Sequence, residues 1–256
     1  MKGRSSIRFF VVWIVVLLIT IFDSCSGGSY KDLPFGGMNG RVQKVTVVHR
    51  MPEMWRVNER GVDVMNIDAL VYDINGFEIC SALMDSTGRV ESEAESMFDN
   101  GVCVRSIQKS DGKVVARLNL ISRNKNTLEY SKNIDGNIGH MTVQKSSSFR
   151  RKSKTVVIED GKITTIIVTQ ADRHGYPVRI LETNPQTGSE ILQVNVYDDK
   201  HNIIEKHVSI KGEEKEEIIY TDYLSFDEQG NWTEARTYNR NHLPVEILVR
   251  KIEYWD

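Results

Sequence analysis

The sequence predicts an all-β protein, an antiparallel meander of roughly 15 to 17 short strands that wraps on itself or splits into packed sheets. Turn signals built from Asp or Asn and Gly recur roughly every 12 residues along the body of the chain. Between the turns, apolar and polar residues alternate with a period of two, as in half-buried strands. Long stretches with the helical period are missing from the sequence, and so many strands exceed what an open twisted sheet usually holds.

The chain opens with an export signal. Basic residues at Lys2, Arg4 and Arg8 precede an apolar run from Phe9 to Phe22. This run is shorter than the roughly 20 residues of a membrane span, but it fits the core of a signal peptide. We therefore expect residues 1–24 to be a signal peptide.

A cysteine follows the apolar run. Ser24 and Ser26 flank Cys25, and the arrangement resembles the lipobox of bacterial lipoproteins, in which the cysteine becomes the acylated first residue of the mature protein. The resemblance implies that Cys25 anchors the protein to a membrane, permanently if it carries several acyl chains. A cleaved signal peptide without acylation and an uncleaved anchor remain as alternatives. The expected location is the bacterial cell envelope, at the outer membrane and facing the periplasm.

The rest of the chain divides into a tether and a two-part body. Residues 25–39 are rich in Gly and Ser without a period, which favours a lipidated N-terminus followed by a flexible tether. The body consists of two halves, residues 40–143 and 155–256. Between them, residues 144–154 are polar and basic and are expected to form a loop. The two halves are expected to share one continuous sheet system.

Two kinds of turn divide the body into hairpins. The longer kind has Asp first and Gly fourth, because Asp can bond its own backbone and Gly tolerates the left-handed conformation. It begins at Asp73, Asp85, Asp172 and Asp227, with a variant at Asp199 in which Asn202 takes the place of Gly. The shorter kind is the tight turn that suits twisted strands. It occurs at Asn100-Gly101, Asp111-Gly112, Asp135-Gly136, Asp160-Gly161 and Lys211-Gly212.

The segments between turns carry strand patterns. Residues 192–196 alternate strictly, whereas residues 163–168 are more continuously apolar, as in a strand covered on both faces. Residues 91–96 alternate Glu with Ser or Ala. The Glu row is expected to form a solvated strand face opposite Arg105 and Lys109 on the next strand.

Aromatic-Asp pairs recur between the two halves. Val71-Tyr72-Asp73 recurs as Val196-Tyr197-Asp198, and Phe98-Asp99 recurs as Phe226-Asp227. These pairs, with the Gly that closes the turn, resemble the YD or RHS-type repeat, and the whole chain is similar to uncharacterised bacterial lipoproteins that carry such repeats. The resemblance implies winding β-hairpins and brings no catalytic residues.

Composition excludes several kinds of site. The formal net charge of −2 gives no field that attracts nucleic acid. The 6 histidines lack metal-ligand spacing, so neither a metal nor a cofactor is expected. Cys80 and Cys103 lie on next-nearest strands of a simple meander, too far apart for a disulfide, and are expected to be free and mostly buried.

Aromatic residues concentrate towards the C-terminus. Tyr223, Trp232, Tyr238 and Trp255 are the candidates for ligand contact, because exposed aromatic rings on one sheet face can stack on sugars or bind a protein partner. Packing of these rings in the core is the alternative.

The sequence therefore predicts a membrane-anchored envelope lipoprotein that acts without catalysis, as a binding or scaffold module for a protein or glycan partner. The alternative is a polysaccharide hydrolase with paired carboxylates on a concave face of the β-sheet, about 5 to 10 Å apart. The chain has 35 Asp and Glu residues, and its sequence singles out no pair among them.

Overall fold

The computed structural model of the protein describes residues 38–52, 64–148 and 151–256. The described residues form 16 strands. The strands are β1 (Val42–Arg50), β2 (Val64–Tyr72), β3 (Glu78–Asp85), β4 (Val90–Asp99), β5 (Val102–Ser110), β6 (Lys113–Asn124), β7 (Thr127–Ile134), β8 (Asn137–Ser148), β9 (Lys152–Glu159), β10 (Lys162–Ala171), β11 (Pro177–Asn184), β12 (Ser189–Tyr197), β13 (Ile203–Ile210), β14 (Glu217–Phe226), β15 (Trp232–Tyr238) and β16 (Pro244–Tyr254).

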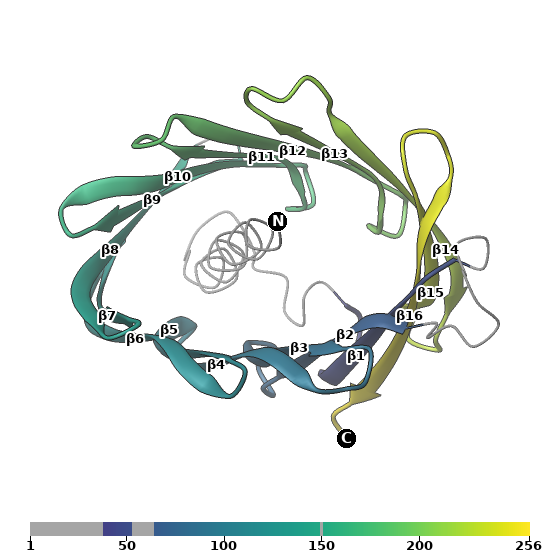
Figure 1. Ribbon diagram of the computed structural model, residues 1–256, viewed down its shortest axis with the longest axis horizontal. Coiled ribbons are helices and arrows are strands. Elements are labelled where there is room, and N and C mark those ends of the chain that lie inside the picture. Colours follow the sequence, from purple (N-terminus) through teal and green to yellow (C-terminus); the bar gives the residue numbers. More distant parts are fainter. Residues whose placement is uncertain (1–37, 53–63, 149–150) are drawn as a thin grey trace, which may run out of the picture.

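These strands form one closed antiparallel barrel, in which each strand pairs with its neighbours in the chain (Figure 1). The last strand, β16, pairs with β1, so that Val249 lies opposite Val48 and Ile252 opposite Val45. Closure pairs the two strands that would otherwise be sheet edges. The predicted antiparallel meander is confirmed, but the sheet closes into a single barrel and does not split into packed sheets.

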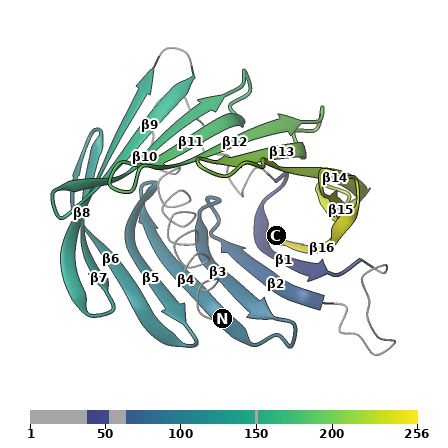
Figure 2. The same ribbon diagram turned by 45° about the horizontal axis from the view of Figure 1, so that its top comes forward.

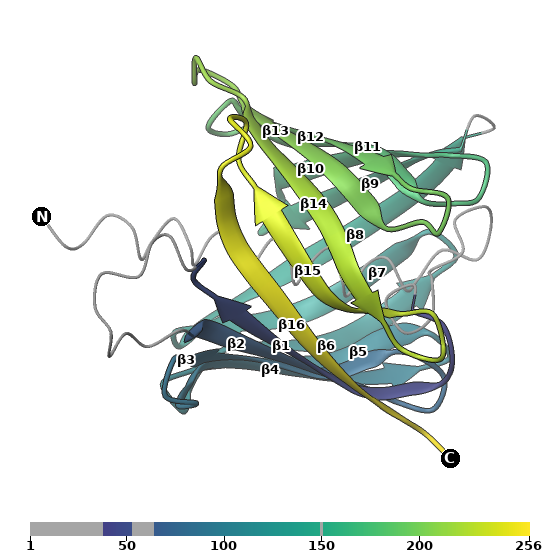
Figure 3. The same ribbon diagram turned by 90° about the vertical axis from the view of Figure 1, so that its right-hand side faces the viewer.

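The barrel is oval in cross-section, and its strands are tilted against its axis (Figures 1, 2 and 3). Tilt and stagger accompany closure of any twisted sheet. Strands that are consecutive in the chain are direct neighbours in the wall. This local connectivity explains why the spacing of turns along the sequence predicts the strand order.

The turns follow the predicted chemistry. The Oδ1 atom of Asp85 accepts hydrogen bonds from the backbone N–H groups of Thr87 at 2.8 Å and Arg89 at 3.0 Å, and Gly88 has a φ of 84°. Two turns differ from the prediction. The tight turn expected at Lys211-Gly212 is a longer connection, because β13 ends at Ile210 and β14 begins at Glu217. The turn expected at Asp199 begins at Asp198, and His201 takes the left-handed position with a φ of 65°.

The polar stretch at residues 144–154 is not the long loop that its composition predicts. Strand β8 ends at Ser148 and β9 begins at Lys152, and the two strands pair with Lys145 opposite Thr155 and Ser147 opposite Ser153. Ladder hydrogen bonds use backbone groups, so polar side chains are compatible with a hairpin that extends into water. Composition alone therefore does not identify a loop here.

Burial distinguishes the inner face of the barrel from the outer face. Ala94 on β4, Tyr130 on β7, Met141 on β8 and Val157 on β9 belong to one buried cluster. Pairing of Tyr130 with Met141 and of Val143 with Val157 puts these side chains on one face of the sheet, so the cluster runs from strand to strand along that face. The outer face carries the most exposed apolar side chain of the described residues, Ile138, which is 82% exposed.

A second buried cluster lies at the seam where the barrel closes. Val42, Val45 and Tyr72 are buried there, and Ile252 and Tyr254 pack against them. The seam therefore joins β16, β1 and β2 through apolar contacts as well as ladder bonds. It also fixes the relative positions of inward-facing side chains from both ends of the chain.

Candidate functional site

The candidate site is a cavity of about 850 Å³ along β13 to β16. Its wall includes Ile219, Thr221 and Tyr223 of β14 and Leu248 of β16. Pairing places Thr221 opposite Thr237 and Tyr223 opposite Ala235, whose side chains are buried on the inner face. The cavity therefore opens into the barrel.

The cavity is elongated. Its lining extends from Asn239, in the turn after β15, to Trp232 at the start of that strand. This is roughly 20 Å at about 3.3 Å per residue. Charged side chains, among them Lys215, Glu216 and Arg240, line the end near the turn, whereas Ile219 and Leu248 make the middle apolar.

Two of the four predicted contact aromatics lie in this cavity. Tyr223 and Trp232 both line it, with their ring centroids 5.7 Å apart. The Tyr223 hydroxyl donates a hydrogen bond to the carbonyl oxygen of Ile203 at 2.9 Å, and burial raises the pKa of this hydroxyl to about 12. Tyr223 is therefore a neutral, oriented phenol at neutral pH.

The other two predicted aromatics lie elsewhere. Tyr238 lies opposite Tyr220 and Pro244, and Trp255 packs against the cluster at the barrel seam. Neither is among the residues that line the cavity. The four aromatics do not form one exposed strip, because strand alternation and the bulge at the start of β15 direct them to different places.

An arginine lies beside the aromatic end of the cavity. The guanidinium of Arg250 lies 3.7 Å from the ring centroid of Trp232, and its Nε donates to the carbonyl oxygen of Trp232 at 2.9 Å. Burial lowers the pKa of Arg250 to about 10, although the group remains charged at neutral pH. Within the described part of the chain, Arg250 has no carboxylate ion-pair partner.

A histidine between two carboxylates lies on the same inner wall. The Nδ1 atom of His49 lies 2.6 Å from Oε1 of Glu246, and Nε2 lies 3.0 Å from Oδ2 of Asp68. Burial opposes the charge on His49, but the hydrogen bonds from Asp68 and Glu246 outweigh it and raise the pKa to about 9. His49 is therefore an imidazolium at neutral pH. Glu246 also lines the cavity, so this group is connected to it.

This arrangement bears on the hydrolase alternative. Asp68 and Glu246 are paired carboxylates on a concave face, as that alternative requires. However, both nitrogens of an imidazolium are donors, so His49 uses both carboxylates as acceptors. A glycosidase needs one carboxyl group that donates a proton to the leaving oxygen. The geometry around His49 does not provide that donor.

Sequence reasoning missed Arg250, His49, Asp68 and Glu246. Each is an isolated polar residue in an alternating strand and carries no motif. Glu246 meets His49 only because β16 pairs with β1, whereas Asp68 meets His49 through the pairing of β1 with β2. Two acceptor atoms beside His49, Oδ1 of Asn66 and Oδ1 of Asp68, are buried without a hydrogen-bond partner. Buried polar atoms are usually hydrogen-bonded, so this part of the wall has acceptors that the protein itself does not satisfy.

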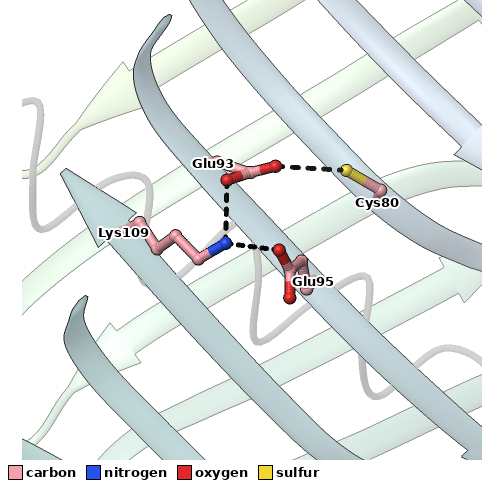
Figure 4. Close-up of polar contacts among 4 residues, drawn as sticks. All are labelled: Cys80, Glu93, Glu95 and Lys109. Atoms are coloured by element: carbon pink, nitrogen blue, oxygen red, sulfur yellow. Dashed lines mark hydrogen bonds and ion pairs between the residues drawn. The ribbon is translucent and has the colours of Figure 1, made fainter. Parts of the chain in front are cut away.

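The outer face of β3 to β5 carries a different polar group, shown in Figure 4. Lys109 contacts Glu95 and lies 3.1 Å from Glu93, whose carboxylate is 4.0 Å from the Cys80 sulfur. The expected pairing of the Glu row with Lys109 is confirmed, whereas Arg105 lies opposite Met97. Burial, together with Glu93, raises the pKa of the Cys80 thiol, which makes it a poor nucleophile.

Cys103 is buried on β5, two strands from Cys80, and neither of these two described cysteines forms a disulfide. In the described ranges, His, Cys, Asp and Glu side chains form no group of three that could hold a metal ion. No helix among the described residues is long and apolar enough to cross a membrane. Cys25, with residues 1–24 and 25–37, lies outside the described residues, so acylation at Cys25 stays a prediction.

Comparison with known proteins reveals a likeness in fold. No family model matches the chain, and no curated protein matches it. A solved structure of a porin-like protein from Bacteroides uniformis matches with a TM-score of 0.52 at 11% identity, over 84% of this chain and 99% of that one. A porin-like protein from Bacteroides vulgatus matches with a TM-score of 0.39 at 9% identity, over 84% and 98%. The fold is that of a porin-like barrel.

This finding corrects the family resemblance. The chain is a closed 16-strand barrel similar to porin-like proteins, not an open lipoprotein of YD or RHS-type repeats. The aromatic-Asp pairs that carried the resemblance lie at strand ends, where Tyr72-Asp73 and Tyr197-Asp198 lead into hairpins. An Asp that begins a hairpin turn is general turn chemistry, so it does not identify a repeat family.

Proposed function

We propose that the protein is a non-enzymatic component of the bacterial cell envelope that binds a small solute inside its barrel, in a transport-type role. The observation that carries this proposal is the elongated inner cavity of about 850 Å³ between β13 and β16. Cavities of a few hundred to about 1,000 Å³ with apolar walls and a few polar groups are typical of small-molecule sites. A protein or glycan partner for the outer surface stays a prediction.

The outer face carries basic side chains on β5 and β6 and also exposed apolar side chains, such as Met97 on β4 and Ile138 on β8. Arg105, Lys109 and Arg117 point outward from neighbouring strands, alternating with inward residues such as buried Ser106. In a membrane barrel, a Lys or Arg on the lipid face costs about 2–4 kcal/mol at the bilayer midplane. The basic residues favour water around β5 and β6, and whether the barrel as a whole enters a bilayer is decided by the conductance measurement below.

The test is to ask whether the native protein carries a solute in this cavity. The full-length chain would be isolated from the envelope of its host, extracted with organic solvent, and the extract analysed by mass spectrometry. A Leu248→Trp variant, which fills the cavity, should recover much less of any specific compound than wild type. Val249→Trp is the matched control, because Val249 neighbours Leu248 but points outward.

The proposal fails if wild type carries nothing above a blank, or if Leu248→Trp and Val249→Trp carry the same amount as wild type. A second measurement addresses conduction. Wild type added to planar bilayers should leave the conductance unchanged. Stable ion-conducting channels that the Leu248→Trp variant narrows would overturn the binding role and favour a pore.

A further inference from the structure

We infer that Arg250, which lies against the cavity-lining ring of Trp232, binds the anionic head group of an amphiphile whose apolar chain lies in the inner cavity. This inference rests on the proposed function and specifies its ligand class. It begins from a cation that the fold partly desolvates and that forms no direct ion pair with a carboxylate among the described residues.

The carboxylate that acts on Arg250, that of Asp227, is already engaged in other hydrogen bonds. Asp227 is committed to its own turn, where Oδ1 accepts from the backbone N–H groups of Gln229 at 3.0 Å and Asn231 at 2.9 Å, and Oδ2 accepts from Tyr254.

The guanidinium is also held in a fixed orientation. One face stacks on Trp232 and Nε is bonded to the backbone, so the terminal Nη atoms remain as donors. Two parallel N–H donors match the oxygens of a carboxylate or a phosphate group. A buried cation without a carboxylate partner is costly, and a bound anion would offset that cost.

The surroundings of Arg250 favour an apolar chain attached to the anion. Leu248 lies two residues before Arg250 on the same face of β16, Val47 lies opposite Arg250 on β1, and Ile219 lines the same cavity. Because Arg250 covers one face of the Trp232 ring, that face is not open for stacking on a sugar. The apolar middle of the cavity, at Ile219 and Leu248, can take an apolar chain that ends before the charged end near Asn239.

Isothermal titration of the full-length protein with simple probes tests this inference. Dodecanoate and dodecyl phosphate, below their micelle concentrations, should bind, and dodecyltrimethylammonium should bind at least tenfold more weakly. Acetate and inorganic phosphate test whether the anion alone suffices, and both should bind weakly. Arg250→Gln should weaken dodecanoate binding by about 10-fold to 100-fold, the effect expected for a lost charged hydrogen-bond pair.

Two variants control the result. Arg250→Lys keeps the charge and should retain part of the affinity, which shows that a loss in Arg250→Gln is not simply misfolding. Arg105→Gln removes an exposed outer charge and should bind like wild type. Circular dichroism would verify that each variant is folded.

The outcomes separate this inference from the proposed function. If all three amphiphiles bind alike, or Arg250→Gln binds dodecanoate as wild type does, the anion-binding role is wrong while a solute-binding barrel stands. Equal affinity for inorganic phosphate and dodecyl phosphate would replace the amphiphile with a free anion. If no probe binds, but wild type from the native envelope still carries a compound that Leu248→Trp does not, then the ligand class is wrong and the solute-binding role stands.

Discussion

His49 links barrel stability to pH in a direction that can be calculated. In the folded barrel, the hydrogen bonds of Asp68 and Glu246 outweigh burial and raise its pKa from an ordinary value of 6.5 to about 9. A group whose folded pKa is raised stabilises the protein below its unfolded pKa, and this contribution is lost as pH rises through the folded pKa. Stability from His49 should therefore be full below pH 6.5 and absent above about pH 9.

The magnitude follows from the two pKa values. Their difference, 9 − 6.5, at 1.36 kcal/mol per pKa unit, gives about 3.4 kcal/mol as an upper value. The linkage relation leaves about 3 kcal/mol at pH 6 and about 2 kcal/mol at pH 7.5. The His49 side chain is only 19% exposed, so solvent screens the interaction weakly.

The assay compares wild type with His49→Gln by urea unfolding, followed by far-UV circular dichroism at pH 6, 7.5 and 9.5. The gap in the free energy of unfolding between the two proteins should shrink by about 3 kcal/mol from pH 6 to pH 9.5. His140→Gln is the matched control, because His140 is exposed on the outer face, and its gap to wild type should stay nearly constant. A gap for His49→Gln that does not change with pH would refute the reasoning.

Three further changes probe the packing and charge of the barrel. Val143→Ala, at a fully buried site in the inner cluster, should lower the free energy of unfolding by about 2 kcal/mol, measured by urea denaturation. Gly139→Ala should displace the side chains of Asp160 and Lys132, because its Cβ would lie 2.6 Å from Oδ1 of Asp160, and should change the free energy of unfolding by less than about 1 kcal/mol, because both are flexible side-chain ends and Ala suits a strand better than Gly; a larger loss would mean that Asp160 is held rigidly. Lys109→Met should leave the melting temperature unchanged, because exposed ion pairs contribute little, and a clear drop would show that the outer charge network is cooperative.

The strand order could be predicted from the sequence because it depends on local chemistry. Turns such as Asp85 to Gly88 and Asp111-Gly112 fix where each hairpin reverses, and in a meander consecutive strands are neighbours. The Glu row of β4 faced Lys109 as expected for the same reason. These features involve residues close together in the chain.

Closure could not be predicted in the same way. Pairing of β1 with β16 joins residues about as far apart as the described chain allows, such as Val45 and Ile252, and no local signal encodes it. A strand that pairs at an open edge has the same alternating pattern as one that closes a barrel. The contacts of His49 with Glu246 and of Arg250 with the seam depend on this closure. The sequence alone therefore could not identify these residues as neighbours.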